Sequence, residues 1–259
     1  MKGEIKASER AEEYLEALYH LIEEEKEITV SQVSQKLGIS APSVFEMFKR
    51  LTEEGYLESS GRGNYCLTEK GRSLGKQIVR RHRLLERLLV DVLKMDWGLA
   101  HEEACRLEHG MSPEMEESLA RTLGNPATCP HGNPIPGEQK EGSPEVPLSA
   151  LHKGRRGIIS RIVDEGREFL RYLASLGIIP GAEIAVEEIA PFGGTRLVSL
   201  GKSRYSLADE IAQKILVREK GKDAPRPQRG DNFDAGSGGG RGKPCPEWPW
   251  WETPMWENP

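Results

Sequence analysis

The sequence predicts a mainly α-helical protein with a β-rich C-terminal part. Residues 1–72 show two helical patterns that are joined by a glycine-containing turn and followed by a hairpin pattern, which predicts a winged helix-turn-helix. Residues 73–140 contain amphipathic helical patterns and predict a helical domain. After a linker at 141–147, short β-branched runs at 148–217 predict a small β-barrel. Residues 218–259 predict a disordered tail rich in Gly, Pro and Trp.

The composition excludes several classes of protein. The 259-residue chain has 37% hydrophobic and 30% charged residues and a formal net charge of −5, so it is not a uniformly basic nucleic-acid-binding protein. No apolar run reaches the ~18–20 residues that a membrane span needs, and the N-terminus lacks the apolar segment of a signal peptide. The scattered cysteines form no disulfide framework. We therefore expect a cytoplasmic protein with reduced thiols and no membrane association.

The N-terminal elements follow the order of a winged helix-turn-helix. Residues 8–25 have the apolar spacing of a helix. A short helix at 31–37, a tight turn at 38–40 and a longer helix at about 42–54 come next, and the last of these would read the major groove of DNA. Residues 56–68 form two β-prone runs around a Ser-Ser-Gly-Arg-Gly-Asn turn, which predicts a hairpin wing. A helical unit with a hairpin but no ligand is the alternative.

Candidate DNA contacts follow from this arrangement. The start of the reading helix would face base edges, and the residues there are Ser40, Pro42, Ser43 and Glu46. Cationic side chains along the same helix and at the wing tip would contact phosphates, and these are Lys49, Arg50 and Arg62. Residues 70–87 hold seven Lys or Arg residues and one Glu, which is either a solvated helix face or a further phosphate-facing surface that includes Lys76. The predicted partner is double-stranded operator DNA.

The helical domain carries more apolar surface than one small domain can bury. Residues 68–95 predict a long helix rich in leucine and valine, and further helical patterns follow at 99–109 and 111–123. This surplus predicts a homodimer. A two-fold dimer suits a palindromic operator.

Metal-binding residue types gather on the predicted helices. Helical spacing within 99–109 places four donors on one face, namely His101, Cys105, Glu108 and His109. The preceding helix offers His82 and Glu86 at i, i+4, and the first helix offers Glu13 and Glu16 at i, i+3. Imidazole, thiolate and carboxylate groups together suit a first-row transition metal. In the connector at 124–147, Cys129 and His131 are two more donors, but without an obvious third they make a poor site.

The C-terminal part changes character. Residues 148–217 contain short β-prone runs bounded by glycines and a helical pattern that ends at Gly177. The tail beyond them is too rich in Gly and Pro to form a core. Its clustered tryptophans are unusual for a solvated tail and leave open a docking motif for a protein partner; they are Trp248, Trp250, Trp251 and Trp256.

Residues 8–217 resemble the diphtheria-toxin-repressor family of metal-dependent transcriptional regulators, which includes iron-dependent and manganese-dependent repressors. The most specific pieces are Arg-Arg-His-Arg-Leu-Leu-Glu-Arg-Leu-Leu, His-Glu-Glu-Ala-Cys-Arg-Leu-Glu-His and Gly-Asn-Pro-Ile-Pro-Gly. The predicted barrel is similar to the ferrous-iron-transport small-protein domain, with Leu-Gly-Ile-Ile-Pro-Gly-Ala as the matching turn.

The resemblance implies a dimer that binds a palindromic operator when metal occupies two neighbouring sites. This corresponds to about two ions per chain. It implies an ancillary site of His82, Glu86 and His101. It also implies a primary site that consists of Cys105, Glu108, His109 and the helix residue Glu13. Glu16 matches a carboxylate of the manganese branch. Barrel residues that would complete the ancillary site have no clear counterpart, although Glu165 and Glu168 lie near.

Fe(II) is the metal that these residues favour, because Cys105 and the iron-transport-like barrel agree, and Mn(II) is the alternative. The expected function is repression of metal-uptake genes. One alternative is a Cys/His hydrolase that uses Cys105, but no oxyanion hole or substrate cleft is evident, so we expect no enzyme. Another is an iron-transport accessory protein, which leaves the helix-turn-helix unexplained.

Overall fold

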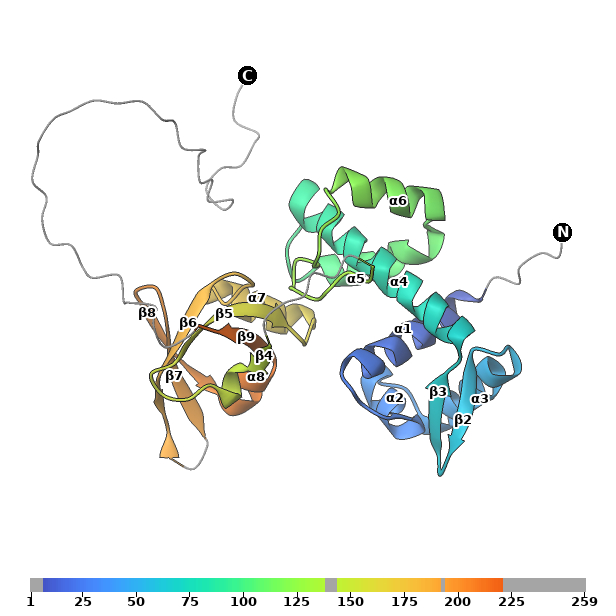
Figure 1. Ribbon diagram of the computed structural model, residues 1–259, viewed down its shortest axis with the longest axis horizontal. Helices are drawn as coiled ribbons and strands as arrows, with labels where there is room; N and C mark the ends of the chain where they lie inside the picture. Colours follow the sequence, from blue (N-terminus) through green and yellow to red (C-terminus); the bar gives the residue numbers. More distant parts are fainter. Residues whose placement is uncertain (1–6, 138–143, 192–193, 221–259) are drawn as a thin grey trace, which may run out of the picture. The chain divides into compact units, whose positions relative to one another are not determined.

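The computed structural model describes residues 7–137, 144–191 and 194–220. Its N-terminal part has three helices and a three-stranded antiparallel sheet of order β1-β3-β2. The elements are α1 (Glu9–Glu23), β1 (Ile28–Thr29), α2 (Val30–Leu37), α3 (Ala41–Glu53), β2 (Leu57–Gly61) and β3 (Asn64–Leu67). Helix α2 ends at Gly38, whose φ of 67° is left-handed, and α3 begins after Ser40, whose hydroxyl accepts from the Ser43 amide. The predicted winged helix-turn-helix is confirmed (Figure 1).

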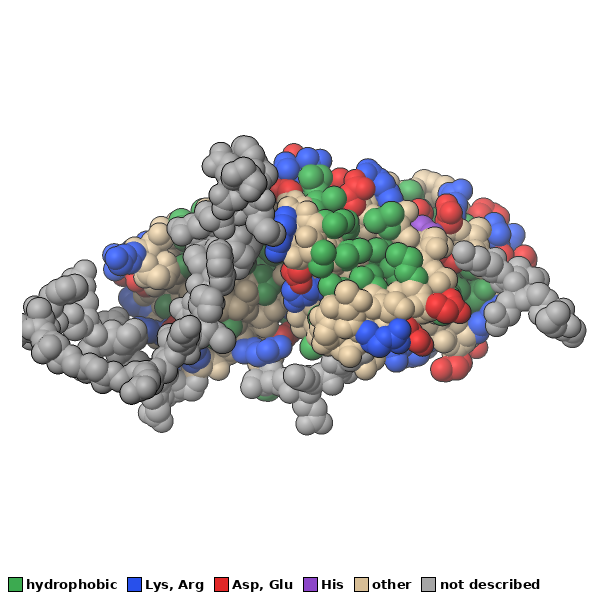
Figure 2. All heavy atoms as spheres, turned by 90° about the horizontal axis from the view of Figure 1, so that it is seen from above, with side chains coloured by type: hydrophobic (Ala, Val, Ile, Leu, Met, Phe, Trp, Pro, Cys, Tyr) green, Lys and Arg blue, Asp and Glu red, His purple; other side chains and the backbone are tan. Residues whose placement is uncertain are grey.

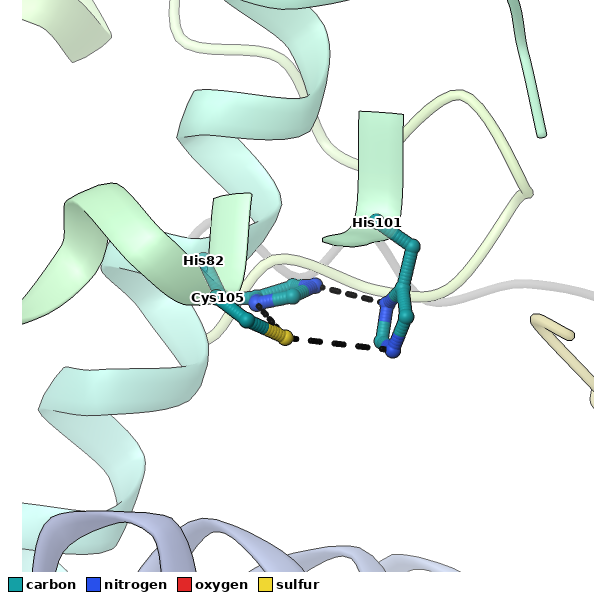
Figure 3. Close-up of side chains that lie close together, drawn as sticks. All are labelled: His82, His101 and Cys105. Atoms are coloured by element: carbon teal, nitrogen blue, oxygen red, sulfur yellow. Dashed lines mark hydrogen bonds between the residues drawn. The ribbon is translucent and has the colours of Figure 1, made fainter. Parts of the chain in front are cut away.

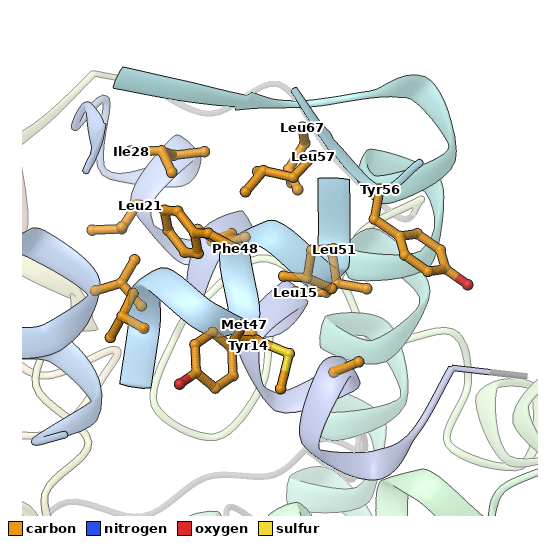
Figure 4. Packing of buried hydrophobic residues seen from close by; sticks show 14 of the residues in the cluster. Tyr14, Leu15, Leu21, Ile28, Met47, Phe48, Leu51, Tyr56, Leu57 and Leu67 are labelled. Atoms are coloured by element: carbon orange, nitrogen blue, oxygen red, sulfur yellow. The ribbon is translucent and has the colours of Figure 1, made fainter. Parts of the chain in front are cut away.

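The N-terminal core explains why these helices pack as they do. The apolar faces of α1 and α3 meet around Phe48, which packs edge-on against Tyr65 of the wing at 4.7 Å between ring centroids. Figure 4 shows Leu15, Leu51 and Leu57 converging on the same core. Burial of these residues turns the opposite face of α3 toward solvent. Arg62 lies at the tip of the wing with a φ of 54°, between two left-handed glycines.

The helical part comprises α4 (Glu69–Arg87), η1 (Leu88–Val92), α5 (Ala100–Leu107), η2 (Glu108–Gly110) and α6 (Pro113–Thr122). The long predicted helix therefore changes at Leu88 to a π-helical turn, in which the Leu93 amide donates to the Leu88 carbonyl. The second predicted helix is also shorter as an α-helix, because Glu108–Gly110 tighten into a 3₁₀ turn. A separate core of leucine and alanine side chains joins these elements.

The C-terminal part is a six-stranded antiparallel sheet of order β4-β9-β5-β6-β7-β8, which curls around its own core (Figure 1). Its elements are β4 (Glu145–Pro147), η3 (Leu148–Ala150), β5 (Arg156–Ile162), α7 (Arg167–Ser175), β6 (Glu183–Ile189), β7 (Thr195–Leu200), β8 (Ser203–Ala208), α8 (Asp209–Gln213) and β9 (Ile215–Glu219). Strand β4 lies within the stretch expected to be a linker, and α8 was not expected. The Trp-rich tail lies outside the described residues. No helix that the structure describes is long and apolar enough to span a bilayer.

Candidate metal centre

Several of the donor residues line a cavity of about 590 Å³, among them Glu13 and Glu16 of α1, His101 and Cys105 of α5, Glu108 and His109 of η2, and Glu165 after β5. Next to these donors His82 is almost fully buried, because α4 packs against both α1 and α5. His82 Nδ1 lies 2.8 Å from Glu108 Oε2, and His82 Nε2 lies 3.0 Å from Glu86 Oε1. A buried imidazole between two buried carboxylates is costly unless the charges are compensated.

A first donor group contains His82, His101 and Cys105, which point toward one another in Figure 3. Cys105 Sγ lies 3.9 Å from His82 Nδ1 and 4.0 Å from His101 Nε2. The expected ancillary ligands His82, Glu86 and His101 also form a close group, which Glu165 joins. Cys105 lies beside this group because His101 and Cys105 are one helical turn apart on α5 and both reach the same imidazole of α4. The assignment of Cys105 to a separate primary site stays a prediction.

A second donor group joins the winged domain to the helical domain. It contains Glu16 of α1, His82 of α4 and Glu108, with 3.5 Å between Glu16 Oε1 and His82 Nδ1. The neighbouring pair of Glu12 and His109 connects the same two parts, with 2.7 Å between Glu12 Oε2 and His109 Nδ1.

Glu13, which the resemblance implied as a ligand of the primary site, stays a predicted ligand. It lines the cavity, but within the described residues it belongs to no close group of three or more donors. Among the α1 carboxylates, Glu12 lies next to His109 of η2, and Glu16 lies next to His82 of α4. These two residues are four apart and share a helix face, and Glu13, three residues before Glu16, borders the same face.

A third donor group contains the connector residues that the sequence left without partners. Glu86, Cys129, His131 and Glu165 have ligand atoms within 4.8 Å of one another. His131 Nδ1 lies 3.2 Å from Glu86 Oε1 and 3.4 Å from Glu165 Oε1, and Glu165 Oε2 lies 3.1 Å from His101 Nδ1. In the sequence, the Cys-Pro-His spacing at 129–131 already indicated two of the four donors of this group. Glu168, by contrast, is exposed.

The segment that carries Cys129 and His131 is held from two sides. Three arginines of α4 reach its backbone carbonyls: Arg80 donates to Pro136, Arg83 to Pro134, and Arg87 to Thr128 and Cys129. On the barrel side, the Ile162 amide donates to the His131 carbonyl at 2.9 Å. Gly132 has no room for a side chain, because a Cβ there would lie 2.1 Å from the Ser160 carbonyl oxygen. The third group is thus built jointly by α4, the connector and the barrel.

The electrostatics of the cavity favour a bound cation. Among the residues that the structure describes, one buried carboxylate oxygen each of Glu16, Glu86 and Glu108 has no hydrogen-bond partner. Burial raises the pKa of Glu108, and the nearby Glu16 charge adds to the effect. Burial alone would lower the pKa of His101, but hydrogen bonds with Cys105, Glu165 and Glu86 outweigh it and raise this pKa to about 12. Burial would raise the pKa of the Cys105 thiol, but hydrogen bonds with His101 and His82 lower it.

The donor set therefore fits a divalent transition ion. Two imidazoles and a thiol suit Fe(II), Co(II) or Zn(II), whereas the carboxylates also suit Mn(II). Such an ion would neutralise the buried carboxylates and replace the protons that the imidazoles hold.

The predicted DNA contacts lie together on the winged domain. Ser40 caps α3, and Pro42 is in its first turn. Glu46, Lys49 and Arg50 are exposed on the same helix, whereas Ser43 is partly buried. Arg62 is exposed on the wing, as expected from its turn.

Comparison with known families matches almost all of the described chain. Residues 6–64 match the N-terminal DNA-binding domain of iron-dependent repressors, residues 68–137 match their metal-binding and dimerisation domain, and residues 146–219 match the FeoA domain. The iron-dependent repressor IdeR of Mycobacterium bovis is 36% identical over 222 residues, which is 80% of this chain and 96% of the relative. The diphtheria toxin repressor of Corynebacterium diphtheriae is 36% identical over 220 residues, with the same coverage.

Solved structures agree with these matches. A manganese-dependent transcriptional repressor in complex with manganese has a TM-score of 0.73 and 32% identity, covering 81% of this chain and all of that one. IdeR of T. acidophilum has a TM-score of 0.67 and 30% identity, covering 83% of this chain and all of that one. ScaR with bound Cd²⁺ has a TM-score of 0.69 and 31% identity, covering 80% and 98%. These relatives are repressors rather than enzymes, and the chain belongs to the iron-dependent repressor family of metal-dependent transcriptional regulators.

Proposed function

We propose that this protein is a metal-activated repressor that binds operator DNA in the cytoplasm as a homodimer and controls metal-uptake genes. The group of Glu16, His82 and Glu108 carries this proposal, because it joins the DNA-binding domain to the helical domain at one point. Without a cation, the carboxylates of Glu16 and Glu108 repel each other and oppose close packing of α1. A divalent ion held by these residues would reverse that balance. Metal and operator then strengthen each other's binding by the same factor.

Fe(II) is our proposed physiological metal, with Mn(II) as the alternative and about two ions per chain. Cys105 and Cys129 each bring a thiol close to an imidazole, which supports a softer ion than Mn(II). The test is footprinting of the DNA upstream of the protein's own gene, under anaerobic conditions, with Fe(II), Mn(II) or Zn(II) at equal free concentrations. Protection that depends on metal supports the function, and full protection by Mn(II) alone would overturn the choice of iron. Equal protection of the DNA with and without metal would overturn the proposed function itself.

An exposed hydrophobic area supports the homodimer. Val92, Leu93, Leu107 and Met115 come from η1 and its following turn, α5 and α6, and each is at least 48% exposed. Figure 2 shows hydrophobic side chains gathered on the face seen from above, over the helical part of the chain. Apolar areas of this kind mark interaction surfaces. The area also lies within the residues that match the dimerisation domain of the family.

Leu93→Glu is expected to convert the dimer to monomers at micromolar concentration. A two-fold interface would bury two introduced carboxylates, so the dissociation constant should rise roughly 100-fold or more. Sedimentation equilibrium measures this change. Tyr172→Glu is the matched control, because Tyr172 is 43% exposed on α7 and lies outside the helical domain. A dimer that survives Leu93→Glu but dissociates with Tyr172→Glu would place the interface on the barrel.

Arg62→Ala is expected to weaken binding to all DNA sequences alike. The exposed guanidinium at the wing tip is suited to a phosphate, so its loss should reduce the salt dependence of log K by about one unit of slope. Fluorescence anisotropy at several salt concentrations measures the slope, with metal at saturation. A change in sequence preference at unchanged slope would contradict the phosphate role.

A further inference from the structure

The exposed face of α3 carries a carboxylate among cations, which is unusual for a surface that approaches DNA. The Glu46 side chain is 71% exposed, and its Oε2 lies 3.8 Å from Lys49 Nζ. Arg10 of α1 and Arg50 of α3 line a shallow hollow together with Glu46. Burial of Val44, Met47 and Phe48 on the other side of the helix fixes this outward orientation.

A carboxylate can only accept hydrogen bonds, so the DNA groups that it can contact are limited. Phosphates repel it. In the major groove the base donors are the amino groups of cytosine N4 and adenine N6. Adenine N6 lies between two acceptors, its own N7 and O4 of the paired thymine, and both would repel a carboxylate. Cytosine N4 has an acceptor on one side only, because the C5–H group lies on the other.

We propose that Glu46 selects a cytosine in each operator half-site by accepting a hydrogen bond from its N4 amino group, while Arg10 and Arg50 contact the backbone phosphates on either side. The inference rests on the proposed DNA-binding function and adds a sequence requirement to it. Arg10 offsets the repulsion between Glu46 and the backbone. It also belongs to α1, the helix that supplies Glu16 to the metal centre, so the position of this cation depends on the same helix as the metal ligands.

The test is selection of bound sequences from a randomised duplex library by the full-length protein loaded with Mn(II), with the wild type and Glu46→Gln in parallel. We expect one cytosine position per half-site for the wild type. Glutamine can pair with adenine N6 and N7, so the variant should select adenine there. In the selected operator, replacing that C·G pair by T·A in one half-site should weaken the wild type about tenfold, and this loss should disappear in Glu46→Gln.

Arg10→Ala is the companion variant. We expect it to weaken all selected sequences to the same degree and to lower the salt slope without changing the preferred base. A shift in base preference with Arg10→Ala would overturn its phosphate role.

The outcomes separate this inference from the proposed function. If the wild type and Glu46→Gln select the same bases, Glu46 is only a surface partner of Lys49 and the inference is wrong, although metal-dependent DNA binding stands. If neither protein enriches any sequence in the presence of Mn(II), whereas circular dichroism shows both folded, the proposed function fails and the inference fails with it.

Discussion

Glu16→Gln is expected to remove most of the increase in operator affinity that metal produces, whereas Glu13→Gln should retain it. Glutamine keeps the size of the side chain but loses the charge that a cation would neutralise beside His82 and Glu108. Coupling between two ligands of a protein typically amounts to about 5- to 150-fold in affinity, so the loss should fall in that range. Glu13 lines the same cavity from the same helix but lies outside every close donor group that the structure describes.

The measurement is the dissociation constant for labelled operator at fixed free Mn(II), with and without a chelator. In the presence of chelator, Glu13→Gln should bind as weakly as the wild type. Glu16→Gln should bind at least as well as the wild type, because loss of its charge relieves the repulsion with Glu108, so a loss seen only with Mn(II) reports the metal-dependent part. Equal losses for Glu13→Gln and Glu16→Gln would contradict the assignment. So would full metal activation of Glu16→Gln, because α1 would then be linked to the helical domain by other residues.

The sequence predicted the local parts of this molecule well. The helix-turn-helix is defined by interactions between residues only a few positions apart. Gly38 ends one helix in a left-handed conformation, Ser40 caps the next, and that next helix is amphipathic. The same is true of the donor face of α5, where His101 and Cys105 are one turn apart. Strand β4 escaped prediction because its pairing with β9 joins residues about seventy positions apart, and its three residues, which end in a proline, show no alternation of their own.

The grouping of metal donors was less accessible to sequence reasoning. Periodicity shows which residues share a helix face, but it does not show which faces meet. Glu86 illustrates the limit, because it was expected only beside His82 and His101, yet it also faces His131 of the connector. That contact depends on arginine side chains of α4 and on the backbone of β5, neither of which leaves a pattern in the connector itself. Family resemblance implied His82, Glu86 and His101 as one set, and these residues do lie close together, whereas its assignment of Cys105 to a second site stays a prediction.

His131→Ala is expected to remove one of the two proposed metal ions, so that bound metal falls from about two to about one per chain. The imidazole lies between Glu86 and Glu165, and Cys129 completes the group. Without it, the buried Glu86 and the partly buried Glu165 would share a site that has lost its nitrogen ligand, and metal affinity there should fall by about two orders of magnitude or more. Equilibrium dialysis against Mn(II) or anaerobic Fe(II), followed by metal analysis, measures the stoichiometry. His152→Ala is the matched control, because His152 is exposed on the barrel domain.

The metal ion that His131→Ala retains makes it possible to distinguish the roles of the donor groups. The group that includes Glu16 contains no connector residue, so His131→Ala should keep partial metal activation of DNA binding, whereas Glu16→Gln should not. Cys129→Ser offers a second check that preserves size: it should weaken Zn(II) more than Mn(II), because a hydroxyl is a poorer ligand than a thiolate for the softer ion. Retention of two ions by His131→Ala would show that the connector only supports the fold. Complete loss of metal activation would show instead that the connector group, rather than Glu16, controls the winged domain.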